Sequence, residues 1–354
     1  MSLYDHKVEL GAWLPIDRKP LLLNHCRTAI MTTNHVGVDI SKASFDAAHL
    51  SAEGKYKHKK FPNTPDGFAS LVTWLTGFGG DKLLIGMEAT GAYSIPLADF
   101  LVAEGYTVSV VNPAKIHAFA RSELSRAKTD KADAKLIARF MREKNPPPWN
   151  PPPANIRELQ AMLRRIEDLL EMQQMERNRR DTAGPAIADS LKAVLDTLEK
   201  ELDAVRKNIK IHINNDPELK RRRDLLESIP GIGPATSAWL LTLLSSHYEF
   251  TNAKQAAAYA GLAPKLQESG KWKGKTTLSK TGDPGLRKAL YMPILNAWQY
   301  NPAIRAFCQR LEAQGKNGMS IACAAMRKMV HIAFAILQSG KPFDPEFKLA
   351  KGAA

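Results

Sequence analysis

Short apolar runs separated by polar turns occupy the first third of the chain and predict a mixed α/β domain. Strands are expected at residues 35–41, 44–50, 57–61, 82–88 and 107–111. The second run alternates and should pair with the first as a hairpin, whereas the last two runs have the continuous apolar character of buried strands. Amphipathic helices are expected at residues 64–75 and 94–104, and helical periodicity continues to about residue 143.

The pattern changes at residues 145–153, where six prolines hold the chain extended and stiff, so this segment is predicted to be a linker. Apolar residues then recur at alternating spacings of three and four, which indicates a heptad-like seam. The seam residues are Ile156, Leu159, Leu163, Ile166 and Leu170, and then Leu191, Leu195, Leu198, Leu202, Val205 and Ile209. A Gly-Pro turn at residues 182–185 separates the two helices, which predicts an antiparallel hairpin or a dimerising coiled coil. A helical spacer within one chain would bury the seam equally well, and we favour oligomerisation.

From Leu226 onward the pattern predicts a mainly helical domain. Residues 228–236, Ser-Ile-Pro-Gly-Ile-Gly-Pro-Ala-Thr, resemble a helix-hairpin-helix turn, in which Gly231 and Gly233 would let backbone N–H groups approach a phosphate. A tight helix–helix turn is the alternative. The whole chain then divides into five segments. They are an N-terminal extension (1–30, with Met31 as an alternative start), an α/β domain (31–145), a linker with a helical hairpin (146–225), the helical domain (226–345) and a tail (346–354).

The charge balance favours a polyanionic partner. The net charge is +14, from 50 Lys and Arg against 36 Asp and Glu, and a chain this basic is more typical of nucleic-acid binding than of membrane binding. The three cysteines are widely scattered and match no zinc spacing, so reduced thiols and a cytoplasmic, bacterial, nucleoid-associated location are expected. We find neither an apolar run of transmembrane length nor the core of a signal peptide.

Basic residues gather in two places. Lys128 and Lys131 frame a late helix, and residues 264–288 hold seven basic residues against two acids, which predicts a flexible loop that contacts phosphates. Trp272 in this loop would stack on a base or anchor the loop by burying its ring. The residues predicted to bind nucleic acid are Lys128, Lys131, Gly231, Gly233, Lys271, Lys273, Lys275, Lys280, Arg287 and Lys288.

Four acids occupy places where a metal site could form. Asp39 lies on the first strand, Glu88 ends the fourth, and Asp130 and Asp133 share one face of a helix. Like charges this close need a cation, and oxygen-only ligands favour Mg²⁺, or Mn²⁺ in its place. The alternatives are strand-end acids that simply face water and a solvated helix with ordinary charge pairs. Antiparallel strands followed by strand–helix–strand–helix are the order of a ribonuclease-H-like fold.

Three motifs carry a resemblance to a known family. They are Gly37-Val38-Asp39-Ile40-Ser41-Lys42, Glu88-Ala89-Thr90-Gly91 and Lys128-Thr129-Asp130-Lys131-Ala132-Asp133. This set resembles the RuvC-like DEDD domain of IS110 family transposases, which are bridge-RNA-guided recombinases of insertion sequences related to Piv-type DNA invertases. The resemblance implies a RuvC-like catalytic domain, catalytic and metal-binding roles for Asp39, Glu88, Asp130 and Asp133, and two metal ions.

The resemblance continues in the helical domain. Residues 260–264, Ser269-Gly270, residues 278–282 and Leu286-Arg287 follow the order of the transposase's second domain. By itself Ser269 is one serine in a polar loop, because a serine nucleophile needs an activating partner. The resemblance implies that Ser269 is the nucleophile, with Ser279 as the nearby rival.

Together these features predict a transposase that cleaves and exchanges DNA strands through a phosphoserine intermediate. The resemblance also implies a structured bridge RNA that selects donor and target DNA, and a homodimer or homotetramer whose working site joins acids of one protomer to a serine of another. A RuvC-like structure-specific nuclease that activates water needs the same four acids and no serine. A third reading is a basic, non-enzymatic scaffold with an idle acid set.

Overall fold

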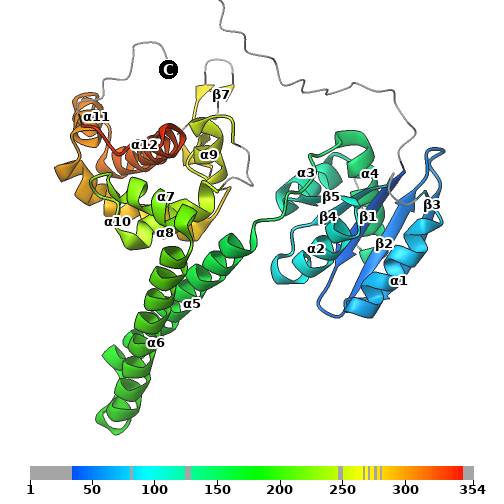
Figure 1. Cartoon of the computed structure of the whole chain (residues 1–354), viewed down its shortest axis with the longest axis horizontal. Helices are drawn as coiled ribbons and strands as arrows, with labels where there is room; N and C mark the ends of the chain where they lie inside the picture. The colour runs from blue at the N-terminus through cyan, green and yellow to red at the C-terminus, as the bar shows by residue number, and fades with distance from the viewer. Residues whose placement is uncertain are drawn as a thin grey trace, which may run out of the picture. The chain divides into compact units, whose positions relative to one another are not determined.

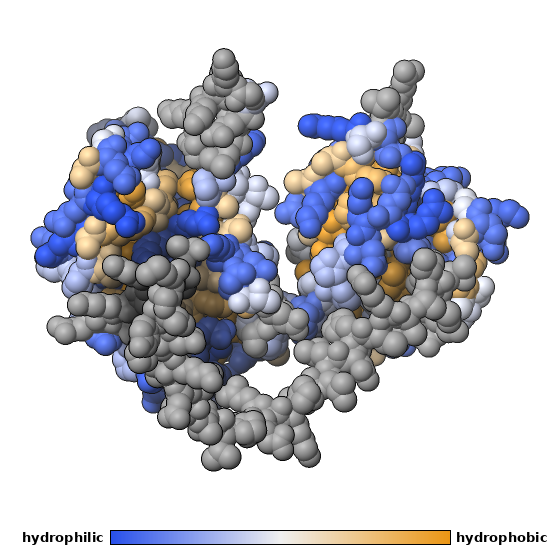
Figure 2. All heavy atoms as spheres, turned by 90° about the horizontal axis from the view of Figure 1, so that it is seen from above, coloured by the Kyte–Doolittle hydropathy of each residue, from blue (hydrophilic) through white to orange (hydrophobic). Residues whose placement is uncertain are grey.

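The structure is a computed structural model that describes residues 34–79, 83–123, 129–245, 250–265, 268–269, 272–274, 277–279 and 281–345. The chain divides into two compact units, Met1–Trp149 and Asn150–Ala354 (Figure 1). The predicted N-terminal extension and the tail after residue 345 lie outside the described residues. Hydrophilic side chains cover much of the surface visible in Figure 2, with smaller apolar areas between them.

A five-stranded sheet with the order β3-β2-β1-β4-β5 forms the centre of the first unit. Its strands are β1 (His35–Ile40), β2 (Ser44–Leu50), β3 (Tyr56–Pro62), β4 (Leu84–Glu88) and β5 (Thr107–Val111). Strand β2 is antiparallel to both β1 and β3, whereas β4 is parallel to both β1 and β5. All five predicted strands are confirmed, with ends shifted by at most two residues.

Helices cover both faces of this sheet. They are α1 (Pro65–Thr76), α2 (Ile95–Ala103), α3 (Pro113–Ser122) and α4 (Asp130–Lys144), with a short 3-10 turn η2 (Gly91–Tyr93) before α2. One core joins alternate residues of β1, namely Val36, Val38 and Ile40, to the apolar faces of α1 and α2. A second, smaller core joins α3 to α4 through Phe119, Phe140 and their neighbours. The two cores make the unit a three-layer α/β/α structure.

Two glycines seat α4 directly on the sheet. Gly37 of β1 and Gly86 of β4 are neighbours in register. A Cβ at Gly37 would overlap the backbone of Ala134 and Ala138, and one at Gly86 would overlap the Met141 side chain. The absence of side chains at these two positions lets the α4 backbone lie against β1 and β4. This contact fixes where the first turn of α4 lies relative to the ends of the two strands.

We expect Gly37→Ala to lower the free energy of unfolding by about 3 kcal/mol. The added methyl group would overlap backbone atoms of α4, and backbone cannot move aside by changing a rotamer as a side chain can. Gly77→Ala is the matched control in the same unit, since Gly77 has a helical φ of −67° and its nearest neighbouring atom would be 3.5 Å from a new Cβ. The measurement is urea denaturation of both full-length variants. Equal midpoints for the two would show that α4 can shift away from the sheet without cost.

The second unit is almost entirely helical. Its long helices α5 (Ala154–Thr182) and α6 (Ala188–Asn215) form the predicted hairpin, joined by a 3-10 turn at Pro185–Ile187. The remaining helices are α7 (Pro217–Glu227), α8 (Pro234–Leu243), α9 (Ala253–Tyr259), α10 (Pro284–Tyr300), α11 (Pro302–Ala313) and α12 (Gly318–Ser339). Seam residues Ile156, Leu159 and Leu163 belong to the core of this unit. The seam is therefore buried within one chain along this part of the hairpin.

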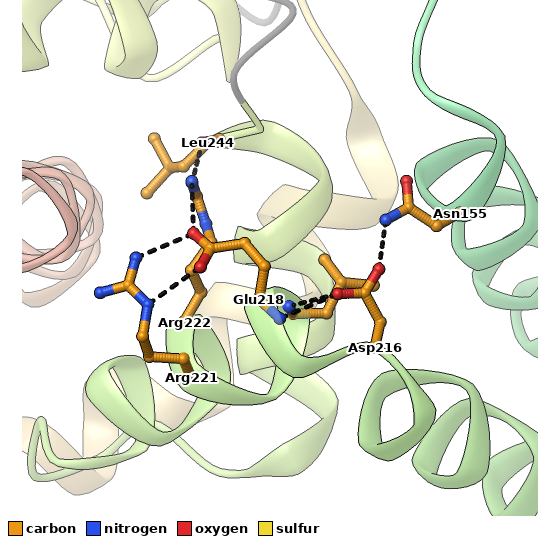
Figure 3. A network of polar contacts seen from close by, with 7 residues as sticks. Asn155, Asp216, Glu218, Arg221, Arg222 and Leu244 are labelled. Atoms are coloured by element: carbon orange, nitrogen blue, oxygen red, sulfur yellow. Dashed lines mark hydrogen bonds and ion pairs between the residues drawn. The ribbon is translucent and has the colours of Figure 1, made fainter.

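A polar network ties the base of the hairpin to the helices that follow it (Figure 3). Asp216 accepts hydrogen bonds from the backbone of Glu218 (2.9 Å) and Leu219 (3.0 Å) and from Asn155 Nδ2 (2.5 Å). These hydrogen bonds, that from the Leu219 backbone first and that from Asn155 second, hold the pKa of Asp216 below its ordinary value. The hydrogen bond from Asn155 to Asp216 joins the start of α5 to the α6–α7 corner, and Arg221 pairs with Glu218 within α7 beside it.

Helix α12 corrects the expectation that no apolar run reaches transmembrane length. Within the part of the chain that the structure describes, it is the one helix that meets the length and hydropathy of a membrane span. It packs against α7, α9, α10 and α11. Eight of its residues are buried: Ile321, Ala322, Ala325, Met326, Met329, Val330, Ala333 and Ile336. These contacts make α12 a central core helix of the second unit.

The predicted linker is partly docked on the first unit. Ser109 Oγ donates to the carbonyl oxygens of Pro146 (3.2 Å) and Pro147 (2.9 Å), and the Trp149 backbone N–H donates to Val108 O (2.7 Å). The Trp149 side chain packs against the core beneath the sheet. Only residues 150–153 therefore separate the docked segment from the start of α5.

Candidate active site

Asp39 and Glu88 come from neighbouring parallel strands. Asp39 is the fifth residue of β1, and Glu88 is the last residue of β4. The register pairs Val38 with Met87, so the two acids follow each other at the same end of the sheet. Asp39 lies on the face that α4 covers, because side chains alternate along a strand and Gly37, two residues earlier, contacts α4.

Asp130 and Asp133 come from the first turn of α4. Thr129 caps this helix, with its Oγ1 accepting a hydrogen bond from the Ala132 backbone N–H (3.2 Å). Carboxylates are stabilised at a helix N-terminus by the exposed N–H groups and the helix dipole. Helix α4 therefore starts at Asp130, and its close packing on Gly37 and Gly86 places its N-terminal end near the ends of β1 and β4.

Electrostatics show that the four acids share one region. The pKa of Asp39 is raised to about 6 from 3.8, first by burial of the carboxyl and then by the charges of Asp133, Asp130, Glu88 and Asp46. All three other predicted acids are among the groups that act on Asp39. Asp39 is thus buried within the electrostatic reach of these three acids, and a bound cation would relieve the cost of its charge.

Asp46 was not predicted and belongs to the same surroundings. It pairs with Asp39 across the β1–β2 hairpin and is only 5% exposed. Its Oδ1 lies 2.6 Å from His58 Nε2, and its Oδ2 lies 3.6 Å from Lys60 Nζ. The Lys60 ammonium in turn lies 3.9 Å from Asp130 Oδ2. The hairpin register could have revealed Asp46, because directly paired residues point to the same face of a sheet.

The donor chemistry of the site suits a hard divalent cation. Asp39, Glu88, Asp130 and Asp133 supply carboxylate oxygens alone, the ligands that Mg²⁺ and Mn²⁺ prefer. Among the described residues, no three Asp, Glu, His or Cys side chains are grouped tightly enough to hold an ion as they stand. The four acids lie in one region, and their side chains would have to rotate to bring their carboxylate oxygens onto one ion.

Ser269 lies on a short antiparallel ribbon in the second unit. The ribbon joins β7 (Glu268–Ser269) to β8 (Trp272–Lys273) and pairs Ser269 with Trp272. A second ribbon pairs β6 (Pro264–Lys265) with β9 (Thr277–Leu278). The predicted loop thus contains local strands, and the Ser269 side chain is exposed at one of them (β7 in Figure 1). The rival Ser279 follows β9 and is partly buried.

The predicted nucleic-acid-binding residues have different surroundings. Lys131 is exposed on α4. Lys288 is 65% exposed and pairs with Glu171 (3.4 Å) on α5, whereas Arg287 donates to the main-chain oxygens of Ala260 (3.3 Å) and Asp283 (3.2 Å). Four of the predicted residues, Lys128, Lys271, Lys275 and Lys280, lie outside the described residues, as do the side chains of Lys273 and Trp272.

The two glycines of the helix-hairpin-helix-like turn also differ. Gly231 has a left-handed φ of 100°, and a Cβ there would overlap Ala297 of α10, so this glycine is needed for close packing. Gly233 precedes α8, and no other atom lies within 4 Å of where its Cβ would be. The α8 N-terminus has no side-chain cap, so its N–H groups at Gly233 are the part of the turn suited to an anion.

Comparison with known proteins identifies the family of this chain. Residues 36–183 match the DEDD-type IS110 transposase model, described as "Transposase", and residues 223–309 match the "Transposase IS116/IS110/IS902 family" model. The chain is 34% identical to pilin gene-inverting proteins of Moraxella lacunata and Moraxella bovis over 318 residues, which are 89% of this chain and 98% of each relative. It is also 29% identical over 161 residues to the transposase for insertion sequence element IS1328 of Yersinia enterocolitica, covering 41% of this chain and 43% of that protein. Two family models matched in order, and similarity over nearly the full length of a pilin gene-inverting protein, lead to one conclusion: the chain belongs to the IS110 family of transposases.

Proposed function

We propose that this transposase cleaves and exchanges DNA strands in a metal-dependent reaction that passes through a phosphoserine intermediate and is guided by a structured bridge RNA. The observation that carries the proposal is the gathering of Glu88, Asp130 and Asp133 around Asp39, whose carboxyl has its pKa raised to about 6 by burial and by their charge. The strand order β3-β2-β1-β4-β5 supports assigning the first unit to the RuvC-like, ribonuclease-H-like folds.

Asp39, Glu88, Asp130 and Asp133 are the residues that would hold Mg²⁺, or Mn²⁺ in its place, as two ions. The bound metal would supply charge neutralisation at the phosphate under attack. The sheet residues Asp39 and Glu88 give the site a fixed base, because β1 and β4, the strands that carry them, each have a paired neighbour on both sides. Asp130 and Asp133 approach from α4 and complete the acid set above the strand ends.

Ser269 is the proposed nucleophile. Its Oγ would form a bond to a DNA phosphorus while the bond from that phosphorus to the leaving deoxyribose oxygen breaks. The hydroxyl proton passes to solvent, and the leaving oxygen takes up a proton. The number of phosphate ester bonds is unchanged, so the energy of the broken bond is kept for rejoining to a new strand. The exposure of Ser269 on its ribbon leaves it accessible to a DNA strand.

The partners of the proposed reaction follow from family membership and charge. DNA is the substrate, since relatives are named for gene inversion and for transposition of an insertion element. A net charge of +14 supports binding to both DNA and a structured bridge RNA. We propose a homodimer or homotetramer in which the acids of one protomer act with the serine of another.

A RuvC-like nuclease that activates water is the second candidate. One observation favours it: the acids Asp39, Glu88, Asp130 and Asp133, with their neighbour Asp46, all belong to the first unit, so hydrolysis would need nothing from the second unit. The two candidates differ in their products. A recombinase leaves protein joined to a DNA end, and a nuclease leaves a free end.

Denaturing electrophoresis of the full-length protein with Mg²⁺, the bridge RNA of its element and end-labelled donor DNA tests the proposal. We expect a slowly migrating protein–DNA band that protease digestion removes and that EDTA, added before the DNA, prevents. Cleaved DNA without this band would support the nuclease instead. Formation of the band at full yield in EDTA would show that the reaction does not depend on the metal.

A further inference from the structure

We propose that Lys60 is a tethered counter-cation of the acid site, which neutralises Asp130 while the divalent cation is absent and contacts a nucleic-acid phosphate once the cation has bound. The inference rests on the proposed function, because it assumes that the four acids bind a divalent cation. It assigns a role to an edge-strand lysine that the predicted nucleic-acid contacts did not include.

Lys60 lies in one row with two carboxylates. The register pairs Asp39 of β1 with Asp46 of β2, and Asp46 with Lys60 of β3, so the three side chains lie on the same face of three adjacent strands. Lys60 Nζ is 3.6 Å from Asp46 Oδ2 and 3.9 Å from Asp130 Oδ2. The ammonium thus connects the sheet to the first residue of α4.

The two ends of this bridge differ in how firmly they are held. The Asp46 side chain is only 7% exposed, and its other oxygen is engaged by His58. A buried carboxylate loses much free energy without such partners, so Asp46 is held in place and Lys60 with it. Asp130 is 66% exposed, and pairs in such surroundings contribute little and exchange readily. Lys60 can therefore release Asp130 and keep Asp46.

A divalent cation would compete with the ammonium for Asp130, because it carries twice the charge and suits carboxylate oxygens. Lys60 is 56% exposed, and a lysine ammonium on its long flexible chain can turn to a new acceptor. On a surface next to a proposed DNA-cleaving site, the acceptor that arrives is a backbone phosphate. One lysine would thus serve first as an internal ion partner and then as a phosphate contact.

The test compares Lys60→Met with Lys59→Met in the full-length protein. Lys59 is the matched control, because it carries the same charge on the same strand, points to the opposite face and lies 5.3 Å from the Phe61 ring. Thermal denaturation at increasing Mg²⁺ gives the Mg²⁺ concentration at which the melting temperature has risen by half of its full increase.

We expect Lys60→Met to lower this Mg²⁺ concentration roughly two- to fivefold, because the variant removes an exposed ion pair that competes with the cation. Lys59→Met should leave it unchanged, and Lys60→Arg should restore it.

A second readout follows binding of a labelled random-sequence DNA duplex against salt, with and without Mg²⁺. We expect Lys60→Met to reduce the slope of log affinity against log salt by about one in Mg²⁺ and to leave it unchanged without the metal. Equal Mg²⁺ midpoints in Lys60→Met and Lys59→Met, or a change of slope that does not depend on Mg²⁺, would overturn the inference and leave the proposed function standing. If Mg²⁺ does not stabilise the wild-type protein, or if its stabilisation by Mg²⁺ is kept in Asp39→Asn, both the inference and the proposed function are overturned.

Discussion

Asp39→Asn is expected to abolish DNA strand cleavage while making the metal-free protein more stable. The variant keeps the size of the side chain and removes the charge at the centre of the acid set. Loss of a proposed metal-binding carboxylate should reduce the cleavage rate by at least about a hundred- to a thousandfold, because in the proposed reaction several kcal/mol of transition-state stabilisation depend on the metal. The rate is measured as cleavage of end-labelled donor DNA with Mg²⁺ and the proposed bridge RNA.

The stability gain follows from the raised pKa of Asp39. Below its ordinary pKa of 3.8 the carboxyl is protonated in both folded and unfolded protein and costs nothing. As the pH rises through that value toward about 6, the unfolded chain loses this proton more readily than the folded protein, and the folded state becomes less stable. The full pKa shift of Asp39 corresponds to a loss of about 3 kcal/mol in the free energy of unfolding. Because the side chain is partly exposed, we expect Asp39→Asn to raise the free energy of unfolding by only about 1–2 kcal/mol at pH 7.5.

Thermal denaturation in EDTA at pH 7.5 and at pH 3.5 measures this gain. The variant should melt several degrees above the wild type at the higher pH. The difference should nearly disappear at the lower pH, where the Asp39 carboxyl is mostly protonated in both the folded and the unfolded state. Addition of Mg²⁺ should stabilise the wild type and not the variant. An inactive variant that is also less stable at pH 7.5 would mean that Asp39 is a structural residue and would remove the electrostatic argument for the site.

Ser269→Ala is expected to eliminate the covalent protein–DNA product, because alanine has no oxygen to form a bond with phosphorus. The loss should be complete within detection, whereas folding should be unaffected, since the serine side chain is exposed at the edge of a two-residue strand. The measurement is the yield of the protease-sensitive band on denaturing electrophoresis. Binding of donor DNA by the variant should match that of the wild type.

Ser279→Ala is the matched control. Ser279 lies in the same segment, and its backbone N–H donates to Ala263 O (2.9 Å), a contact that alanine retains. We expect Ser279→Ala to keep the covalent product. The reverse result, with the band lost in Ser279→Ala and kept in Ser269→Ala, would move the nucleophile to Ser279. A band that persists in both variants would exclude these serines as the point of attachment.

Most of the first unit was predictable because its strands are short apolar runs bounded by turns. The prediction for residues 107–111 coincides with β5, and the helix that carries Asp130 and Asp133 begins where the sequence places it. In the second unit the predicted flexible loop at residues 264–288 extends too far. Helix α10 begins at Pro284, and Asp283 caps it by accepting from the Gly285 N–H (2.8 Å). A Cβ at Gly285 would overlap the ends of the Trp239 and Glu167 side chains, which pack closely over the start of α10.

The site was predicted less completely than the fold, for reasons of distance along the chain. Asp39, Glu88, Asp130 and Asp133 could be proposed from element order and family motifs. Asp46 was within reach of the sequence through the register of the predicted β1–β2 hairpin, although it was not proposed. Lys60 was not, because its role depends on ion pairs with residues far away in sequence, such as Asp130. The assignment of Ser269 depends on family resemblance alone, because spacing does not show which partner would activate a serine.

The docked part of the proline-rich segment has a consequence for how this chain can vary. Since Trp149 is held by Val108, only residues 150–153, Asn-Pro-Pro-Pro, join the two units. In the extended proline conformation each residue spans about 3.1 Å, so the joint spans about 12 Å. Each inserted or deleted residue therefore changes the reach of this joint by about a quarter. Among related transposases, the length of this joint should therefore tolerate less change than the residues that compose it.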